Sequence, residues 1–144
     1  MLVLCSKRLG FNSSQTSIVA QKLYSRGFIS YPRTESRAYS KQMTNGFGDI
    51  LHTLKRYEPF KDHCNGLLEQ DEWNHDHVNE TLNEDHPPIT PVIINKNKLR
   101  IHQKSDSFKL YDLIVRSFFA SLSTDMKYTE NVATFSIMNE SFTY

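Results

Sequence analysis

Residues 28–36 read Phe-Ile-Ser-Tyr-Pro-Arg-Thr-Glu-Ser and place a phenol two positions before a guanidinium, with a proline between them. In an extended segment, residues i and i+2 project to the same side. Pro32 fixes its own φ and biases Tyr31 away from the helical region. Tyr31 and Arg33 are therefore expected to face the same way, as a nucleophile and a cation acting on one phosphodiester would.

The chemistry that this pair could perform is nucleophilic attack on phosphorus. A phenol is almost entirely un-ionised at neutral pH, and an adjacent positive charge favours the reactive phenolate. Arginine stays charged and offers a planar fork that matches two phosphate oxygens. Attack by Tyr31 would form a phosphotyrosyl link and release a sugar hydroxyl. The alternative is a half-buried aromatic ring beside a solvated Arg33, as in many ordinary loops.

A second block, residues 85–91, reads Asp-His-Pro-Pro-Ile-Thr-Pro. Histidine titrates near neutral pH, which suits a reversible cycle of breaking and resealing because acid and base roles must exchange. His86 is therefore a second candidate catalytic residue. The alternative is a proline-stiffened surface loop that begins with a histidine.

Residues 20–36, Ala-Gln-Lys-Leu-Tyr-Ser-Arg-Gly-Phe-Ile-Ser-Tyr-Pro-Arg-Thr-Glu-Ser, resemble the active-site signature of type IA DNA topoisomerases. The wording Tyr-Pro-Arg-Thr-Glu is most similar to the topoisomerase III branch, and residues 85–91 resemble the histidine motif of its beta subtype. Residues 111–120 are similar to the helix that closes the family's tyrosine domain. The resemblance covers nearly the whole chain, although residues 42–84 match in position more than in wording.

The resemblance implies roles for individual residues. Tyr31 becomes the nucleophile that holds the 5′-phosphate of a broken single strand, Arg33 the cation that binds the scissile phosphate, and His86 a phosphate contact or a group that tunes its partners' charges. A second strand then passes through the gap before the break is resealed. The family implies single-stranded DNA as substrate, with RNA as a second candidate, and scaffold or helicase proteins as partners. It also implies a nuclear location, with the cytoplasm as a second candidate.

The resemblance also implies an architecture, an α+β fold that is mainly helical. We expect residues 1–12 to be a lead-in from a preceding region, residues 13–124 to be the tyrosine domain, and residues 125–144 to start the β-rich hinge domain. Type IA enzymes bind Mg²⁺ through acidic residues of an amino-terminal Toprim domain. Since no such domain precedes Cys5, we expect a truncated piece that binds no cofactor itself and does not complete a full cycle alone.

Composition limits the class of protein. With 144 residues, of which 38% are hydrophobic and 12% aromatic, the chain is long and apolar enough for one folded domain. No apolar run approaches the ~18 residues of a membrane span, and the start does not read as a secretory signal, so we predict no membrane association. Cys5 and Cys64, the only cysteines, give no disulfide framework and indicate a reducing compartment.

Charge is distributed unevenly along the chain. Residues 1–44 carry seven Lys or Arg against one acidic residue, whereas residues 45–90 carry three basic and ten acidic side chains. The basic third also holds several tyrosines, and cations interleaved with aromatic rings suit a single nucleic-acid strand. The candidate contacts are Lys22, Arg26 and Arg37. Two alternatives stay open: a solvated helix face, and a non-catalytic strand-binding module derived from the enzyme.

A metal site is not predicted. His63-Cys64 and His75-Asp76-His77 could be interpreted as a metal cluster, but their spacing matches no zinc pattern, and His-x-His flanked by acids is common in polar loops. The alternative hypothesis is an interaction domain that holds zinc through this loop.

The first element that must position these side chains is a helix over about 14–26, which residues 12–14 cap and Gly27 ends. Residues 28–31 then form an extended exit that carries the nucleophile away from the helix. On this helix Lys22 and Arg26 are expected to face nucleic acid. The residues predicted to be buried are Ile18, Val19 and Leu23.

Further along, the pattern predicts a helix over 49–57 capped by Asp49 and a polar loop over 61–85 around one short helix near 64–70. A longer helix is predicted over 105–122. From Thr129 the period changes to that of strands, with alternation over 132–138 and a partner strand that begins at 142–144.

Overall fold

The computed structural model describes residues 1–70, 73–74, 76–79, 86–92, 102–138 and 140–143. Helices and two small sheets make a mixed chain that is mainly helical, which confirms the predicted α+β class at that level. In chain order the elements are α1 (Leu2–Leu9), α2 (Ser13–Ser25), β1 (Tyr39–Ser40), α3 (Lys41–Thr44), α4 (Phe47–Leu54), α5 (Glu58–Leu68), β2 (Val78–Asn79), α6 (Asp106–Leu122), β3 (Thr134–Ile137) and β4 (Glu140–Thr143).

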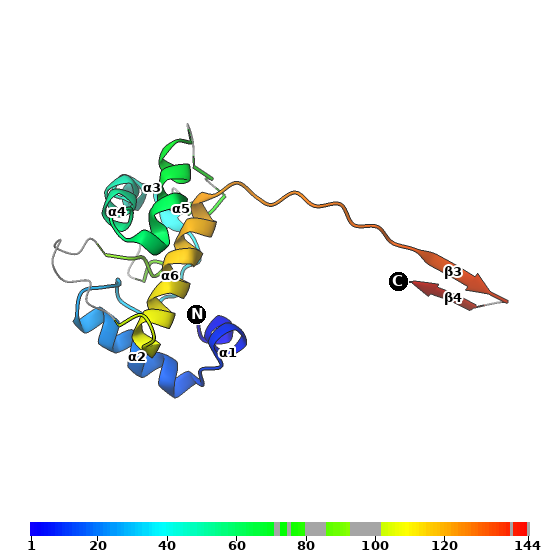
Figure 1. Ribbon diagram of the computed structural model, residues 1–144, viewed down its shortest axis with the longest axis horizontal. Helices are drawn as coiled ribbons and strands as arrows, with labels where there is room; N and C mark the ends of the chain where they lie inside the picture. The colour runs from blue at the N-terminus through cyan, green and yellow to red at the C-terminus, as the bar shows by residue number, and fades with distance from the viewer. Residues whose placement is uncertain (71–72, 75, 80–85, 93–101, 139, 144) are drawn as a thin grey trace.

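Helix α6 runs through the centre of the helical body, between α2 on one side and α4 and α5 on the other (Figure 1). The Ser105 side chain caps it by accepting a hydrogen bond from the Phe108 backbone N–H at 3.2 Å. Its buried residues recur at helical spacing over a wide face, and it contacts α1, α2 and α5. The helix predicted over 105–122 is therefore confirmed.

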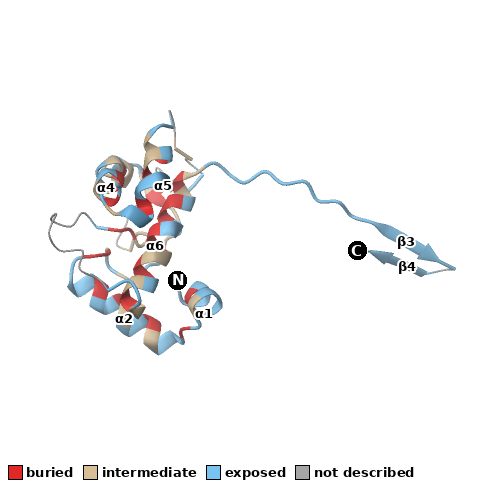
Figure 2. Cartoon of the chain, in the orientation of Figure 1, coloured by how far each residue is buried: buried red, intermediate tan, exposed pale blue. Residues whose placement is uncertain are grey.

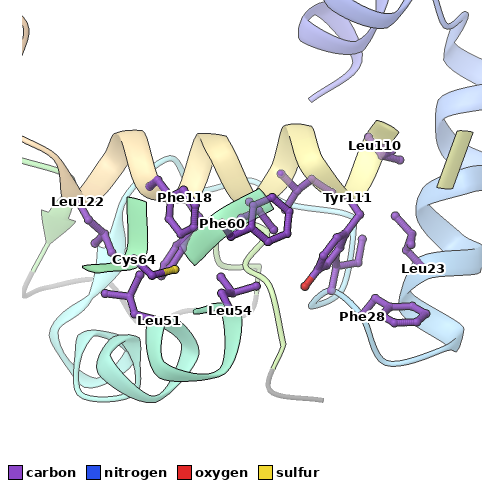
Figure 3. Packing of buried hydrophobic residues seen from close by; sticks show 14 of the residues in the cluster. Leu23, Phe28, Leu51, Leu54, Phe60, Cys64, Leu110, Tyr111, Phe118 and Leu122 are labelled. Atoms are coloured by element: carbon purple, nitrogen blue, oxygen red, sulfur yellow. The ribbon is translucent and has the colours of Figure 1, made fainter. Parts of the chain in front are cut away.

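Aromatic rings join the two halves of the core along α6 (Figure 3). Tyr111 packs edge-on against Phe28 and Phe60, with ring centroids 6.0 and 6.2 Å apart. Phe118 packs edge-on against Phe47 at 5.1 Å. Each such pair contributes ~0.5–1.5 kcal/mol beyond the burial of its area. Because Phe28 directly follows α2 while Phe60 lies in α5, these contacts fix the segment after α2 to the rest of the body.

The ends of α2 match the prediction closely. The Asn12 side chain accepts a hydrogen bond from the Gln15 backbone N–H at 2.8 Å, so it caps the helix. Gly27, just beyond the other end, takes a φ of 74°. This left-handed conformation favours glycine and turns the chain out of the helix.

The face that α2 buries differs from the predicted one. Its fully buried residues are Thr16, Ala20 and Leu23. Leu23 is thus confirmed as a core residue, and Val19 is partly buried against the core. The prediction for Ile18 is wrong, because that side chain is 67% exposed. Ile18 is two positions from both Thr16 and Ala20, which places it on the far side of a helix with 3.6 residues per turn.

The middle of the chain is more helical than predicted. Helix α4 starts at Phe47, with Asp49 inside its first turn, so the prediction that Asp49 caps this helix is wrong. Helix α5 occupies Glu58–Leu68, much of which was predicted to be loop. Only three of its residues are buried, and the charged and polar residues around them weaken the periodic signal. These buried residues are Phe60, Cys64 and Leu67.

The strands form two separate pairs. β1 pairs with β2 in parallel, whereas β3 and β4 form an antiparallel hairpin in which Phe135 lies opposite Phe142. The strands predicted near the end of the chain are confirmed over β3 and β4, and Tyr144 lies outside the described residues. Every residue of β3 and β4 is exposed, and Figures 1 and 2 show the hairpin at the end of an extended segment, away from the helical body.

Candidate active site

The segment after α2 carries Tyr31 from the core to the surface within three residues. Phe28 and Ile29 are each 1% exposed, whereas Tyr31 is 42% exposed. The Phe28 backbone N–H donates to the Leu23 carbonyl at 3.0 Å, which fixes the start of the segment on α2. The phenol is therefore presented to solvent from a support that packing holds in place, as a precisely positioned reactive group requires.

Two hydrogen bonds join Ser30, the residue before the phenol, to the segment that follows His86. The Ser30 backbone N–H donates to the Thr90 carbonyl at 2.9 Å, and the Thr90 backbone N–H donates to the Ser30 hydroxyl oxygen at 2.9 Å. The Val92 backbone N–H donates to the Phe28 carbonyl at 3.1 Å, one bond further along. Two sequence blocks that lie about sixty residues apart are thus paired directly beside Tyr31.

A second attachment lies on the other side of the nucleophile. The backbone N–H groups of Glu35 and Ser36 both donate to the His86 carbonyl, each at 3.2 Å. The Tyr31 and His86 rings have centroids 6.5 Å apart and are tilted by 34°. Residues 31–34 therefore form a short loop whose two ends are both fixed to the segment that carries the histidine.

The three predicted catalytic residues line one open cleft of about 690 Å³, which we call the Tyr31 cleft. Tyr31, Arg33 and His86 line it together with Glu35, and residues of α1 and Ser17 of α2 complete its walls. Arg33 is exposed and has no ion-pair partner among the residues that the structure describes. Its charge is thus available to an anionic ligand in the cleft.

His86 presents one nitrogen that the described part of the chain leaves unsatisfied. Its Nδ1 atom is buried and has no hydrogen-bond partner there. A buried polar nitrogen without a partner is uncommon, and such atoms concentrate at sites that await a ligand or another group. The position of this ring beside Tyr31 makes it part of the site.

Tyr24 is a site residue that the sequence did not single out. Its ring packs edge-on against Tyr31, with centroids 5.3 Å apart, and it is 40% exposed. The prediction treated it as part of an apolar stripe on α2. No spacing rule relates a residue within a helix to one in an extended segment seven positions later, so this contact had no detectable signal.

The three predicted nucleic-acid contacts are placed differently. Lys22 lines a hollow of about 500 Å³ that shares Ser17, Pro32 and Arg33 with the Tyr31 cleft. Arg37 lines a third hollow, of about 360 Å³, on the opposite side of Thr34. The Arg26 guanidinium lies over the Phe28 ring at 4.9 Å and lines none of the three. Lys22 and Arg37 therefore border the cleft, whereas Arg26 packs against the core.

The most strongly perturbed titrating groups lie in the core and not in the cleft. Burial raises the pKa of Cys64 to about 11, and burial also raises the pKa of Tyr111. Burial raises the pKa of Cys5 and of Tyr39 as well. All four groups stay un-ionised at neutral pH, and both cysteines are free thiols sealed from solvent. None of them is a candidate nucleophile.

The described residues offer no metal centre and no membrane span. They contain no group of three or more His, Cys, Asp or Glu side chains that could hold a metal ion. The His63 ring stacks on Phe119 at 5.9 Å, and His75 of the predicted loop lies outside the described residues. No helix in the described ranges is long and apolar enough to cross a membrane.

Comparison with known proteins gives consistent similarities along the whole chain. A family profile described as DNA topoisomerase matches residues 1–144. DNA topoisomerase 3-beta of Drosophila melanogaster is 31% identical over 142 residues, which cover 99% of this chain and 15% of that protein. DNA topoisomerase 3-beta-1 of Mus musculus is 32% identical, covering 99% of this chain and 16% of that protein. DNA topoisomerase 3-alpha of Drosophila melanogaster is 30% identical, covering 97% and 10%. The chain thus spans about a sixth or less of these relatives.

Proposed function

The chain belongs to the DNA topoisomerase family, and we propose that it carries the strand-cleaving tyrosine of a type IA enzyme of the topoisomerase III branch. In this proposal Tyr31 attacks a phosphodiester of single-stranded DNA and holds the 5′-phosphate. A second strand passes through the break, and the break is then resealed. The observation that carries the proposal is the exposed Tyr31 phenol in one cleft with Arg33 and His86.

The proposed step balances as a transesterification. A bond forms between the Tyr31 oxygen and phosphorus, and the bond from phosphorus to the 3′ oxygen of the sugar breaks. The phenol loses its proton, and the departing 3′ oxygen gains one. Since no bond energy is lost to water, the reverse attack by the 3′ hydroxyl reseals the strand and frees Tyr31.

Arg33 and His86 support that step electrostatically. A guanidinium without a protein ion-pair partner can take two phosphate oxygens and stabilise the charge that develops on them. Two backbone hydrogen bonds to the His86 carbonyl hold the histidine segment against the loop that carries Arg33. We assign to His86 a contact with the same phosphate.

The Mg²⁺ that the family implies does not fit the residues described in this chain. Among them the Tyr31 cleft has one carboxylate, Glu35, and no three metal-binding side chains come together. Mg²⁺ prefers several oxygen ligands, of which carboxylates are the protein's usual contribution. We therefore assign Mg²⁺ to acidic residues of a Toprim domain and derive no step of this chain through it.

The domain assignment remains part of the proposal. Residues 13–124 are the tyrosine domain, residues 125–144 begin a β-rich hinge, and residues 1–12 lead into the domain. Helix α1 packs on α2 and α6, and the exposed β3–β4 hairpin stands apart from the helical body, in keeping with this division. We further propose a nuclear protein, also present in the cytoplasm, that acts on DNA or RNA strands with scaffold or helicase partners.

A non-catalytic strand-binding module is the second candidate function. The exposed cations Lys22 and Arg37 border the cleft whether or not Tyr31 reacts, and the chain spans only 15% of the Drosophila topoisomerase 3-beta. Strand binding alone would use these cations through release of counterions, and it would weaken steeply with salt.

Labelled oligonucleotides separate the two functions. The chain, joined to the Toprim portion of a topoisomerase III, is incubated with single-stranded DNA and Mg²⁺ and then denatured. A 5′-phosphotyrosyl link retains a label placed on the 3′ end of the strand and releases one placed on the 5′ end. Retention of the 3′ label by the parent protein and its loss in Tyr31→Phe support the enzyme. Strand binding without any retained label leaves the module.

A further inference from the structure

We propose that the hollow beside Arg37 binds one nucleobase of the strand whose phosphate lies at Tyr31. This inference rests on the proposed function, because it takes a single strand as the ligand. The hollow, which we call the Arg37 pocket, has a volume of about 360 Å³ and lies between α1, the loop after Tyr31, residues 88–89 and α6. Its volume falls within the range of about 300–1,000 Å³ that small-molecule sites occupy.

The Arg37 pocket continues the Tyr31 cleft. Thr34 lines both, and so does Met1. Thr34 directly follows Arg33, the residue that we assign to the scissile phosphate. A strand that leaves Arg33 along this loop therefore passes Thr34 and reaches Arg37.

The chemistry of the Arg37 pocket matches one nucleotide. Its inner wall is apolar and includes Ile89, Leu113, Ile114 and Phe118. Arg37 is exposed, has no ion-pair partner among the described residues, and none of the described lining residues is acidic. Single-stranded nucleic acid combines a charged backbone with flat apolar bases, so a cation beside an apolar hollow suits a phosphate and the base next to it.

The walls of the Arg37 pocket are held in place before any ligand binds. The Ser36 hydroxyl donates to the Ala38 carbonyl at 2.8 Å and accepts from the Ala38 backbone N–H at 3.1 Å, so the backbone on both sides of Arg37 is fixed. The Tyr39 ring packs edge-on against Phe118 at 6.5 Å, and the Tyr39 hydroxyl accepts from Ser121 at 3.3 Å. A preformed hollow of this kind loses little entropy on binding.

The test fixes the register of the strand without using cleavage. Tyr31→Cys places an exposed thiol in the cleft, while Cys5 and Cys64 are sealed in the core. The thiol forms a disulfide with an oligonucleotide that carries a thiol on one phosphate, and exchange with a small thiol measures the equilibrium constant of attachment. A set of strands with a single abasic site at successive positions then reports the contribution of each base.

We expect one abasic position, on one side of the tether, to lower the attachment constant about tenfold. This value corresponds to ~1.4 kcal/mol, within the ~1–3 kcal/mol that a base contributes by stacking. Ser117→Trp fills the Arg37 pocket from the exposed face of α6 and is expected to abolish that difference. Ala120→Trp, an exposed α6 position outside the pocket, is the matched control and should preserve it.

Two results overturn the Arg37 pocket. One is an attachment constant that is the same for every abasic position, including the case in which no strand attaches better than a tethered thiol alone. The other is a position-specific loss that persists in Ser117→Trp. Should that variant fail to fold by circular dichroism, Arg37→Ala replaces it and must reduce the salt slope of attachment by about one. Because the tether needs no cleavage, a missing Tyr31 adduct refutes the enzyme and leaves the pocket standing, whereas a flat abasic scan refutes only the pocket.

Discussion

Tyr31 and Tyr111 carry the same side chain in two opposite environments. Tyr111 is 0% exposed between Phe28 and Phe60, and its hydroxyl has no hydrogen-bond partner among the described residues. Tyr31 is 42% exposed beside a free guanidinium and a histidine. Burial stabilises the un-ionised phenol, whereas an exposed site lined by a cation favours the phenolate. The comparison shows that the surroundings decide which tyrosine is structural and which is reactive.

The largest expected effect separates the two tyrosines directly. Tyr31→Phe removes the attacking oxygen and should abolish covalent adducts while leaving strand binding nearly unchanged. Tyr111→Phe should leave adduct formation intact. Both variants are measured by retention of a 3′-labelled single strand after denaturation. Adducts that survive in Tyr31→Phe would refute the choice of nucleophile.

The next effect tests the cation beside Tyr31. Arg33→Ala removes the donor that we assign to the phosphate and should lower the rate of adduct formation ~10²–10³-fold, the range found when one preorganised donor is lost. Arg33→Lys keeps the charge without the planar fork and should recover only part of this loss. Arg26→Ala is the matched control, because Arg26 lies over Phe28 outside the cleft. Equal losses in Arg33→Ala and Arg26→Ala would contradict a specific role for Arg33.

A smaller effect tests the attachment between the two segments. Ser30→Ala leaves the Thr90 backbone N–H without its acceptor, and Thr90 is buried. An unsatisfied buried donor costs ~1–3 kcal/mol of unfolding free energy. Urea denaturation measures this loss, and Ser25→Ala, an exposed serine of α2, is the control. If Ser30→Ala and Ser25→Ala have equal stability, the hydrogen bond does not hold the segments together.

The pH dependence of stability tests the buried side of the comparison. The pKa of Cys64 is raised from 9.0 to about 11, so the folded chain keeps a proton that the unfolded chain releases above pH 9.0. The free energy of unfolding should therefore be constant below pH 9.0 with respect to this group and fall as pH rises towards about 11. Chemical denaturation across that range measures the fall. Cys64→Ala should make it shallower, and an unchanged slope would contradict the burial of this thiol.

The smallest effect concerns the Tyr111 hydroxyl alone. Because that oxygen is buried without a partner in the described part of the chain, Tyr111→Phe removes a polar group that folding leaves unsatisfied. We expect the variant to be as stable as the parent or more stable by up to ~1 kcal/mol. A loss of more than ~1 kcal/mol in urea denaturation would indicate a hydrogen bond from this hydroxyl in solution.

The candidate site was largely predictable from the sequence because its chemistry is written in two short blocks. Tyr31, Arg33 and His86 were identified from residue type and spacing, and the structure brings them into one cleft. The attachment of Ser30 to Thr90 was not predictable, since it uses two backbone groups and a hydroxyl across a long gap, and no periodicity encodes such a pair. Tyr24 was missed for the same reason.

The fold was predictable where apolar spacing is dense and uncertain where it is sparse. Helix α6 buries many residues at helical intervals, and its predicted limits are correct. Helix α5 buries few residues among charged neighbours, so its pattern is typical of a loop. Ile18 shows a third case. Apolar type alone does not give the phase of a helix, and the small residues Thr16 and Ala20 define the inward face of α2.

The most direct test of the account is to identify the residue that carries the strand. The adduct formed with single-stranded DNA is digested with a nuclease and a protease, and mass spectrometry locates the nucleotide phosphate on a peptide. The account predicts that this phosphate is on Tyr31. A phosphate on Tyr24, Tyr111 or any other side chain would contradict it.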